Sequence, residues 1–354
     1  MKDPNERADT RHLQRLLEGV NAKDDYLTAG DLDGLCRRPR GFWRSPHTVS
    51  AVQLPESYGK IHGFSLTPGD QPCITTEINN MITVVCGETG CQTSYVLQRA
   101  DHGMDPAELV SHVGFNRDGL PVTDVYHLQI LTELPHEEWC RMWPAYIYIG
   151  ADKRYVCHAP NPCLTVLSDG SVLYILEPSE GVQEVYRDGQ KLNIPPGRLY
   201  GREWLLASDG MLYTTWVDFD KRWCFGPYNQ DPCLVKIGYP CRGIVELMDG
   251  LSLLMAWGDS GCIIRQRIDG TFVGTGATIP LLPKTYQSGL TQLPDGREIF
   301  IASARHGGEC VQIWDQPLTP FDYVTQPFQK NGAWHYYGLD TSSDARFLCL
   351  MRVP

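Results

Sequence analysis

One serine of the chain lies in a setting typical of a catalytic nucleophile. Ser260 follows Asp259 and is enclosed by Gly258 and Gly261. A serine hydroxyl attacks a carbonyl when a histidine takes its proton, an aspartate orients that histidine, and backbone N–H groups stabilise the oxyanion. The same four residues, however, separate two apolar runs whose other ends carry Asp-Gly pairs. We therefore expect Ser260 to be a turn residue.

Other candidate chemistry is sparse. The 10 histidines form no H-E-x-x-H motif, the spacing that a zinc protease needs, and the 13 cysteines include no C-x-x-C pair. We interpret the cysteines as reduced, mostly buried thiols, and expect no catalytic, metal or cofactor residues. Asp218 and Asp220 could act as paired carboxylates, although they fit a turn equally well. Exposed tryptophans could stack on sugars, but we favour packing between blades for them.

The elements around Ser260 indicate a four-stranded antiparallel unit. Asp-Gly between apolar runs predicts a hairpin, because glycine takes positive φ without steric cost. Four antiparallel strands in about 40 residues correspond to one propeller blade. The four runs and the turns after the first three of them are Val245–Met248 with Asp249-Gly250, Leu251–Trp257 with Gly258–Gly261, Cys262–Arg267 with Asp269-Gly270, and Thr271–Gly276.

Similar hairpin signals recur along the chain. The second turn residue falls at positions 80, 119, 170, 210, 250, 296 and 345, in steps of 39 to 51 residues. That period is typical of propellers, in which each unit is a blade that cannot bury its faces alone. We therefore predict an all-β, seven-bladed β-propeller over residues 47–354. Six blades is the alternative if the unit at Asn79-Asn80 is not a true blade.

The ring needs closure, because an open end would expose a sheet edge. The last unit has only two predicted strands before Pro354. Two apolar runs precede the first complete unit and are not assigned to any other predicted unit, Thr48–Leu54 and Ile61–Leu66. We expect these N-terminal strands to complete the C-terminal blade.

Residues 1–46 are predicted to form a separate helical and basic arm. Asp3, Pro4 and Glu6 are typical of a helix start. An apolar stripe at helical spacing follows, made of Leu13, Leu16, Leu17 and Val20, and after it comes a basic and aromatic cluster that includes Arg37, Arg38, Arg40, Trp43 and Arg44. We predict that these nine residues contact other protein subunits. Packing of the stripe on the arm's own propeller is the alternative.

Charge and hydropathy exclude several classes. The formal net charge of -11 argues against a general nucleic-acid binder, which needs a basic face. No apolar run approaches the roughly 18 residues of a membrane span. The N-terminal segment lacks the apolar region of a secretory signal, so we expect synthesis in the cytoplasm.

Three resemblances bear on function. Ser303–Asp315, SARHGGECVQIWD, resembles one unit of the Trp-Asp repeat propellers, which implies an interaction platform. Gly258–Gly261 is similar to the nucleophile segment of chymotrypsin-like proteases, but no segment resembling that family's histidine motif accompanies it. Ser208-Asp209-Gly210 is only superficially similar to the boxes of sialidase propellers. More loosely, the predicted architecture resembles the hub and adaptor propellers of bacteriophage tails.

Two functional hypotheses follow. The first is a non-enzymatic structural or interaction scaffold, for example a virion tail component that docks through its arm. The second is a glycan-directed propeller, a hydrolase or a lectin, with its site at the mouth of the central channel.

Overall fold

Every element with described bounds in the computed structural model is a β-strand. The structure describes residues 46–88, 91–100, 108–127, 135, 138, 142–157, 163–179, 182–231, 233–235, 241–257, 262–278, 290–293, 296–303, 309–313, 316–317, 321–341 and 345–353. Within these residues, no helix has the length and hydropathy of a membrane span. The predicted arm helix, its apolar stripe and its basic cluster lie outside the described residues.

Six sheets each contain four strands that follow one another in the chain. Neighbouring strands pair antiparallel, so each sheet is a simple meander. The six sheets are β2 Tyr58–Leu66, β3 Pro72–Ile78, β4 Met81–Cys86, β5 Thr93–Arg99; β6 Glu108–Phe115, β7 Pro121–His127, β8 Ala145–Ile149, β9 Asp152–Cys157; β10 Cys163–Val166, β11 Val172–Ser179, β12 Val182–Arg187, β13 Gln190–Lys191; β14 Leu199–Leu206, β15 Leu212–Val217, β16 Trp223–Pro227, β17 Cys233–Leu234; β18 Cys241–Leu247, β19 Gly250–Trp257, β20 Cys262–Arg267, β21 Phe272–Thr278; and β22 Leu290–Gln292, β23 Glu298–Ser303, β24 Glu309–Ile313, β25 Gln316–Pro317.

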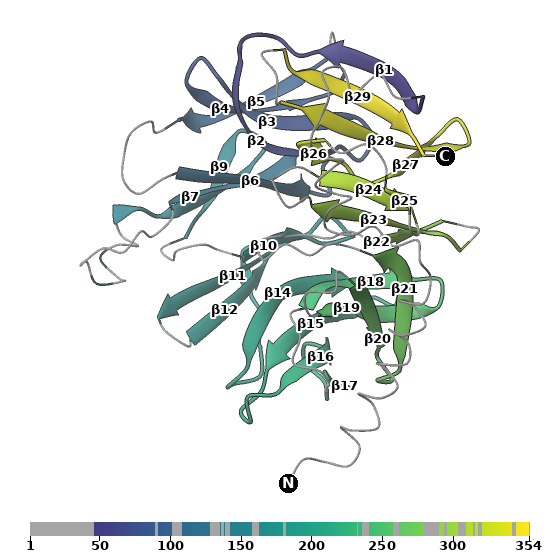
Figure 1. The fold of residues 1–354 in the computed structure, drawn as a ribbon. Helices are drawn as coiled ribbons and strands as arrows, with labels where there is room; N and C mark the ends of the chain where they lie inside the picture. The colour runs from purple at the N-terminus through teal and green to yellow at the C-terminus, as the bar shows by residue number, and fades with distance from the viewer. Residues whose placement is uncertain are drawn as a thin grey trace. The chain divides into compact units, whose positions relative to one another are not determined.

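A further sheet joins the two ends of the described chain. Its path runs β1-β29-β28-β26, and β27 also pairs with β28. Figure 1 shows β1, in purple, lying alongside β29, in yellow, and Val52 of β1 is paired with Leu348 of β29. The five strands are β1 Thr48–Gln53, β26 Tyr323–Val324, β27 Phe328–Lys330, β28 Ala333–Asp340 and β29 Phe347–Arg352.

The fold is therefore an all-β β-propeller, but it has six regular four-stranded blades rather than the predicted seven. One expected strand was also misplaced. Ile61–Leu66 belongs to β2, which pairs with β3 and begins the next sheet instead of completing the C-terminal one. That place is taken by β26 and β27, which are two and three residues long, too short to show an alternating pattern in the sequence.

The described residues form two compact units, one within 200–322 and the other comprising 47–199 and 323–354. In the second unit the first strands β2, β6 and β10 lie next to one another, and in the first unit β18 lies next to β22. These consecutive sheets within each unit thus meet along their first strands, as the blades of a propeller do.

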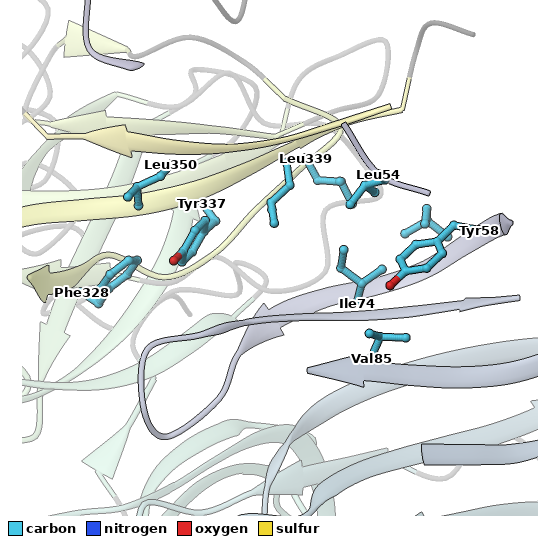
Figure 2. Close-up of a cluster of buried hydrophobic side chains, with 10 residues drawn as sticks. Leu54, Tyr58, Ile74, Val85, Phe328, Tyr337, Leu339 and Leu350 are labelled. Carbon is cyan, nitrogen blue, oxygen red and sulfur yellow. The ribbon is translucent and has the colours of Figure 1, made fainter. Parts of the chain in front are cut away.

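The second strand of a sheet is covered on both faces. The first five residues of β3, of β7 and of β15 are all buried, although alternate residues point to opposite faces. By contrast, β1 and β5 are mostly exposed. Figure 2 shows how one such interface is filled: Leu339 from the C-terminal sheet lies across from Ile74 and Val85 of the β2–β5 sheet. A sheet separated from its neighbours would expose these apolar side chains.

Pairing of β1 with β29 generates the first prediction. Removal of residues 1–54 should expose the edge of β29 and delete the buried Leu54, so the free energy of unfolding should fall by several kcal/mol, and the protein should aggregate. Removal of residues 1–45 leaves β1 intact and serves as the matched control. Urea unfolding of the two truncated proteins measures the difference. Equal stability of the two would contradict a structural role for β1.

Candidate functional site

Most of the residues that the sequence singled out lie outside the part of the chain that the structure describes. Ser260 and its turn lie outside the described residues, as do the nine predicted contact residues of the arm. Trp314-Asp315 also lies outside them, directly after β24, so the resemblance to a Trp-Asp repeat stays a prediction. In the described part of the chain, no three His, Cys, Asp or Glu side chains are grouped to hold a metal ion.

Asp218 and Asp220 are placed in the turn between β15 and β16. The amide of Lys221 donates to the carbonyl of Asp218 at 3.0 Å, and Lys221 takes a φ of 60°. The Asp218 carboxylate accepts the backbone N–H groups of Asp220 and Arg222, each at 2.9 Å. Its Oδ2 also accepts both Nε and Nη2 of Arg222, at 2.9 and 2.7 Å. These hydrogen bonds stabilise the turn.

The two carboxylates share one cation and are not arranged for acid–base catalysis. Asp220 lies 2.8 Å from Nη2 of the same Arg222. The hydrogen bonds from the Arg222 side chain and backbone lower the pKa of Asp218, and the hydrogen bond to Asp218 raises the pKa of Arg222. A general acid needs the opposite shift, because it must hold its proton near neutral pH. The turn interpretation of Asp218 and Asp220 is therefore the one that fits the structure.

The same turn presents two aromatic side chains to solvent. Phe219, at its tip, is 78% exposed, and Trp223, the first residue of β16, is 41% exposed. Trp216, one strand away, is only 1% exposed and packs in the core, as expected for the tryptophans generally. Exposed aromatic side chains are enriched among the residues that anchor binding partners, so this turn is a candidate binding surface. We call residues Asp218–Trp223 the aromatic tip.

A second polar cluster was not recognised in the sequence. Asp169, in the first turn of the β10–β13 sheet, accepts Nη2 of Arg187 at 2.7 Å. Arg117, from the first turn of the β6–β9 sheet, donates to Asp188 at 2.8 Å. Burial opposes the ionisation of Asp169, but the hydrogen bonds from Ser171 and the charge of Arg187 outweigh it and lower its pKa. These groups pair with one another and tie two sheets together.

The same pairing recurs in the β18–β21 sheet. Asp249 accepts Arg267 at 2.5 Å and the buried Arg265 at 3.0 Å. In both sheets an aspartate of the first turn meets an arginine 18 residues later, at the end of the third strand. The sequence could have indicated these ion pairs through the repeated spacing of 18 residues between the aspartate and the arginine. These clusters pair charges within and between sheets, so among the polar and aromatic features described above the aromatic tip is the candidate binding surface.

Comparisons with known proteins do not assign the chain to a family. No protein-family model and no curated protein match the chain. Similar solved structures include a chain of the mitotic checkpoint complex, at 12% identity and a TM-score of 0.44, covering 90% of this chain and 95% of that one. BBS1N in complex with ARL6DN is similar at 10% identity and a TM-score of 0.46, covering 87% and 96%. Trypanosoma rangeli sialidase in complex with sialic acid is similar at 10% sequence identity and a TM-score of 0.42. The match covers 86% of this chain and 57% of the sialidase chain. These identities and TM-scores are too low to indicate function.

The ion pairs of Asp249 generate a prediction about pH. Burial opposes its ionisation, but the hydrogen bond from Arg267 and the charge of Arg265 outweigh it and lower the pKa of Asp249. A carboxyl whose pKa is lower in the folded state stabilises the fold above its ordinary pKa of about 4, and this contribution disappears as the pH falls through the folded value. Asp249→Asn should therefore cost roughly 2 kcal/mol at pH 7 and progressively less towards pH 2.

Urea unfolding at pH 7, 5 and 3 checks this expectation. The control is Asp118→Asn, because the exposed Asp118 carboxylate accepts a long hydrogen bond from the Asn116 side chain, at 3.3 Å, and this variant should match the unsubstituted protein at pH 7 within about 0.5 kcal/mol. A constant difference between Asp249→Asn and the unsubstituted protein at all three pH values would contradict the role of the charged carboxylate.

The rigidity of the aromatic tip generates another prediction. Asp218→Ala removes the acceptor for the amides of Asp220 and Arg222, so hydrogen exchange at both amides should become at least tenfold faster. Asp220→Ala keeps these amides bonded to Asp218 and should leave the exchange at Arg222 unchanged. Exchange followed by NMR distinguishes the two variants. Equal rates at Arg222 in both would show that the carboxylate does not hold the turn.

Proposed function

We propose that the protein is a non-enzymatic interaction scaffold whose aromatic tip docks a protein partner. The observation that carries the proposal is the exposure of Phe219 on a turn whose charged groups are already paired with each other. Aromatic residues and arginine are the side chains most enriched at binding hot spots. Because Asp218 and Arg222 are held in place before binding, a partner that covers Phe219 loses little entropy in ordering the tip.

The partner that we propose is the N-terminal arm of a second copy of this chain. The predicted stripe from Leu13 to Val20 is marginal as a helix in water and needs an apolar surface. The tip supplies one, with Phe219 and Trp223 flanked by charged groups. The basic cluster from Arg37 to Arg44 would meet a protein of net charge -11, which favours pairing between copies.

Sedimentation velocity of the purified full chain over a concentration series tests this function. The unsubstituted chain should associate. The Phe219→Ser, Trp223→Ser double variant and the Leu13→Asp, Leu17→Asp double variant should each weaken association roughly thirtyfold, since losing an aromatic or apolar anchor costs about 2 kcal/mol. Thermal melting should be unchanged in both.

The matched control is Met248→Ser. Met248 is 73% exposed and also lies at a hairpin turn, but in the first turn of the next sheet, so its replacement should leave association unchanged. A full chain that stays monomeric, or double variants that associate like the unsubstituted chain, would overturn the proposed partner. A lower melting temperature of the Leu13, Leu17 variant with intact association would show that the stripe packs on its own propeller.

The exposed aromatic faces favour one second function, carbohydrate binding by stacking on Trp223. The similar sialidase was solved in complex with sialic acid, which we therefore choose as the probe. Calorimetric titration should detect binding that Trp223→Ala abolishes if the tip is a glycan site. Hydrolysis is not favoured there, because Asp218 and Asp220 are both paired with Arg222.

Three finer features complete the proposal. We propose that the pairing of β1 with β29 in the five-stranded sheet holds the two ends of the described chain together. We propose a virion tail as the assembly, supported only by the architectural resemblance to phage tail propellers. We also propose synthesis in the cytoplasm, on the sequence alone.

A further inference from the structure

Two buried thiols of the β2–β5 sheet touch each other. Cys73 in β3 and Cys86 at the end of β4 are directly paired across the strands, and their Sγ atoms are 3.0 Å apart. Directly opposed residues of an antiparallel pair have Cα atoms about 4.5–5.5 Å apart, which lies within the range that a disulfide spans. A sulfur–sulfur bond of about 2.05 Å therefore needs a shift of about 1 Å and no change of register.

The surroundings favour a thiol pair over a metal site. Both cysteines are buried, with exposures of 1% for Cys73 and 9% for Cys86. Val84 completes the buried cluster, and Tyr95 and Phe115 pack against it. Among the described residues no third metal-binding side chain joins the two sulfurs. The pair therefore has the geometry for bond formation and lacks the ligands for a metal ion.

The two sulfurs are not equivalent. The hydrogen bond with Cys73 lowers the pKa of Cys86 despite its burial, while the same bond, together with burial, raises the pKa of Cys73. Cys86 is also the more exposed of the two. It adjoins the turn that begins at Gly87 and leads to the exposed Cys91. Cys86 is thus the sulfur of the pair that loses its proton more readily and that a small oxidant reaches first.

We propose that Cys73 and Cys86 are a redox modification site that closes to a cross-strand disulfide when a hydroperoxide oxidises Cys86. The Cys86 thiolate attacks one oxygen of hydrogen peroxide, the O–O bond breaks, and the departing hydroxide takes a proton to become water. The Cys73 sulfur then attacks the sulfenic acid at Cys86, the S–O bond breaks, and the hydroxide leaves as water with the Cys73 proton. In total, two thiols and one peroxide give one disulfide and two waters.

The bond would lie beside a contact between two sheets. Glu88, two residues after Cys86, accepts the hydroxyl of Tyr337 in β28 at 2.8 Å and lies 3.5 Å from Nζ of Lys330. Gly87 takes a φ of 113°, and a Cβ atom there would lie 2.5 Å from the carbonyl oxygen of Cys91. Joining β3 to β4 at this point fixes the segment that carries Glu88.

Peptide mapping of the full-length protein tests the proposal. The reduced protein is treated with hydrogen peroxide, denatured and alkylated with N-ethylmaleimide, then digested. We expect Cys73 and Cys86 to lose alkylation together, at least tenfold faster than the buried Cys157 and Cys349, and a linked peptide about 2 Da lighter than its two parts to appear. Dithiothreitol should restore both sites.

Cys157 and Cys349 are internal controls that need no variant, because they are single buried thiols of the same unit whose burial raises the pKa of each to about 12. Cys73→Ser should abolish the linked peptide and leave Cys86 to oxidise further to a sulfinic acid. Equal alkylation of all four cysteines after peroxide would overturn the proposal. A peptide linking Cys86 to Cys91 instead would also overturn it.

Discussion

Each regular blade depends on a tight first turn in which one residue has a positive φ. At Gly170 this requirement also affects the contact with the preceding sheet. Gly170 has a φ of 75°, and its amide closes the turn on the carbonyl of Leu167 at 2.8 Å. Its own carbonyl accepts the amide of Arg117 from the preceding sheet at 3.1 Å. A Cβ atom at Gly170 would lie 2.4 Å from that same amide nitrogen. The missing side chain thus shapes one hairpin and lets the preceding sheet approach.

Further polar ties run from a first turn to the next sheet in the chain. Ser208 donates to Glu246 through its amide at 2.8 Å, and the amide of Met248 donates to the Gln292 side chain at 3.1 Å. In a meander the second turn lies at the other end of the sheet, where the aromatic tip projects. The first-turn end therefore holds neighbouring blades together, and the opposite end of the β14–β17 sheet is left to present Phe219.

Most of the hairpins could be predicted because an Asp-Gly turn requires local chemistry that the sequence displays. The turns at Gly119, Gly170 and Gly210 join first and second strands, as expected. The turn at Asn79-Asn80 does not: it joins β3 to β4, the second and third strands of its sheet. The first turn there has Asp70 at a φ of 57°, a left-handed residue without the Asp-Gly signature. Equating the two kinds of turn displaced one strand, Ile61–Leu66, which begins the β2–β5 sheet.

The binding surface was harder to predict, because exposure depends on what neighbouring sheets cover. Trp216 and Trp223 lie on paired strands only one register step apart, yet one is buried and the other is not. Asp218 and Asp220, which lie between them in the chain, could be interpreted as catalytic carboxylates from the sequence. The sequence does not show which cationic residue pairs with each carboxylate. In the structure Arg222 forms ion pairs with both Asp218 and Asp220, which accounts for their charges within the turn itself. The charged residues of the tip thus serve to present Phe219 rather than to react.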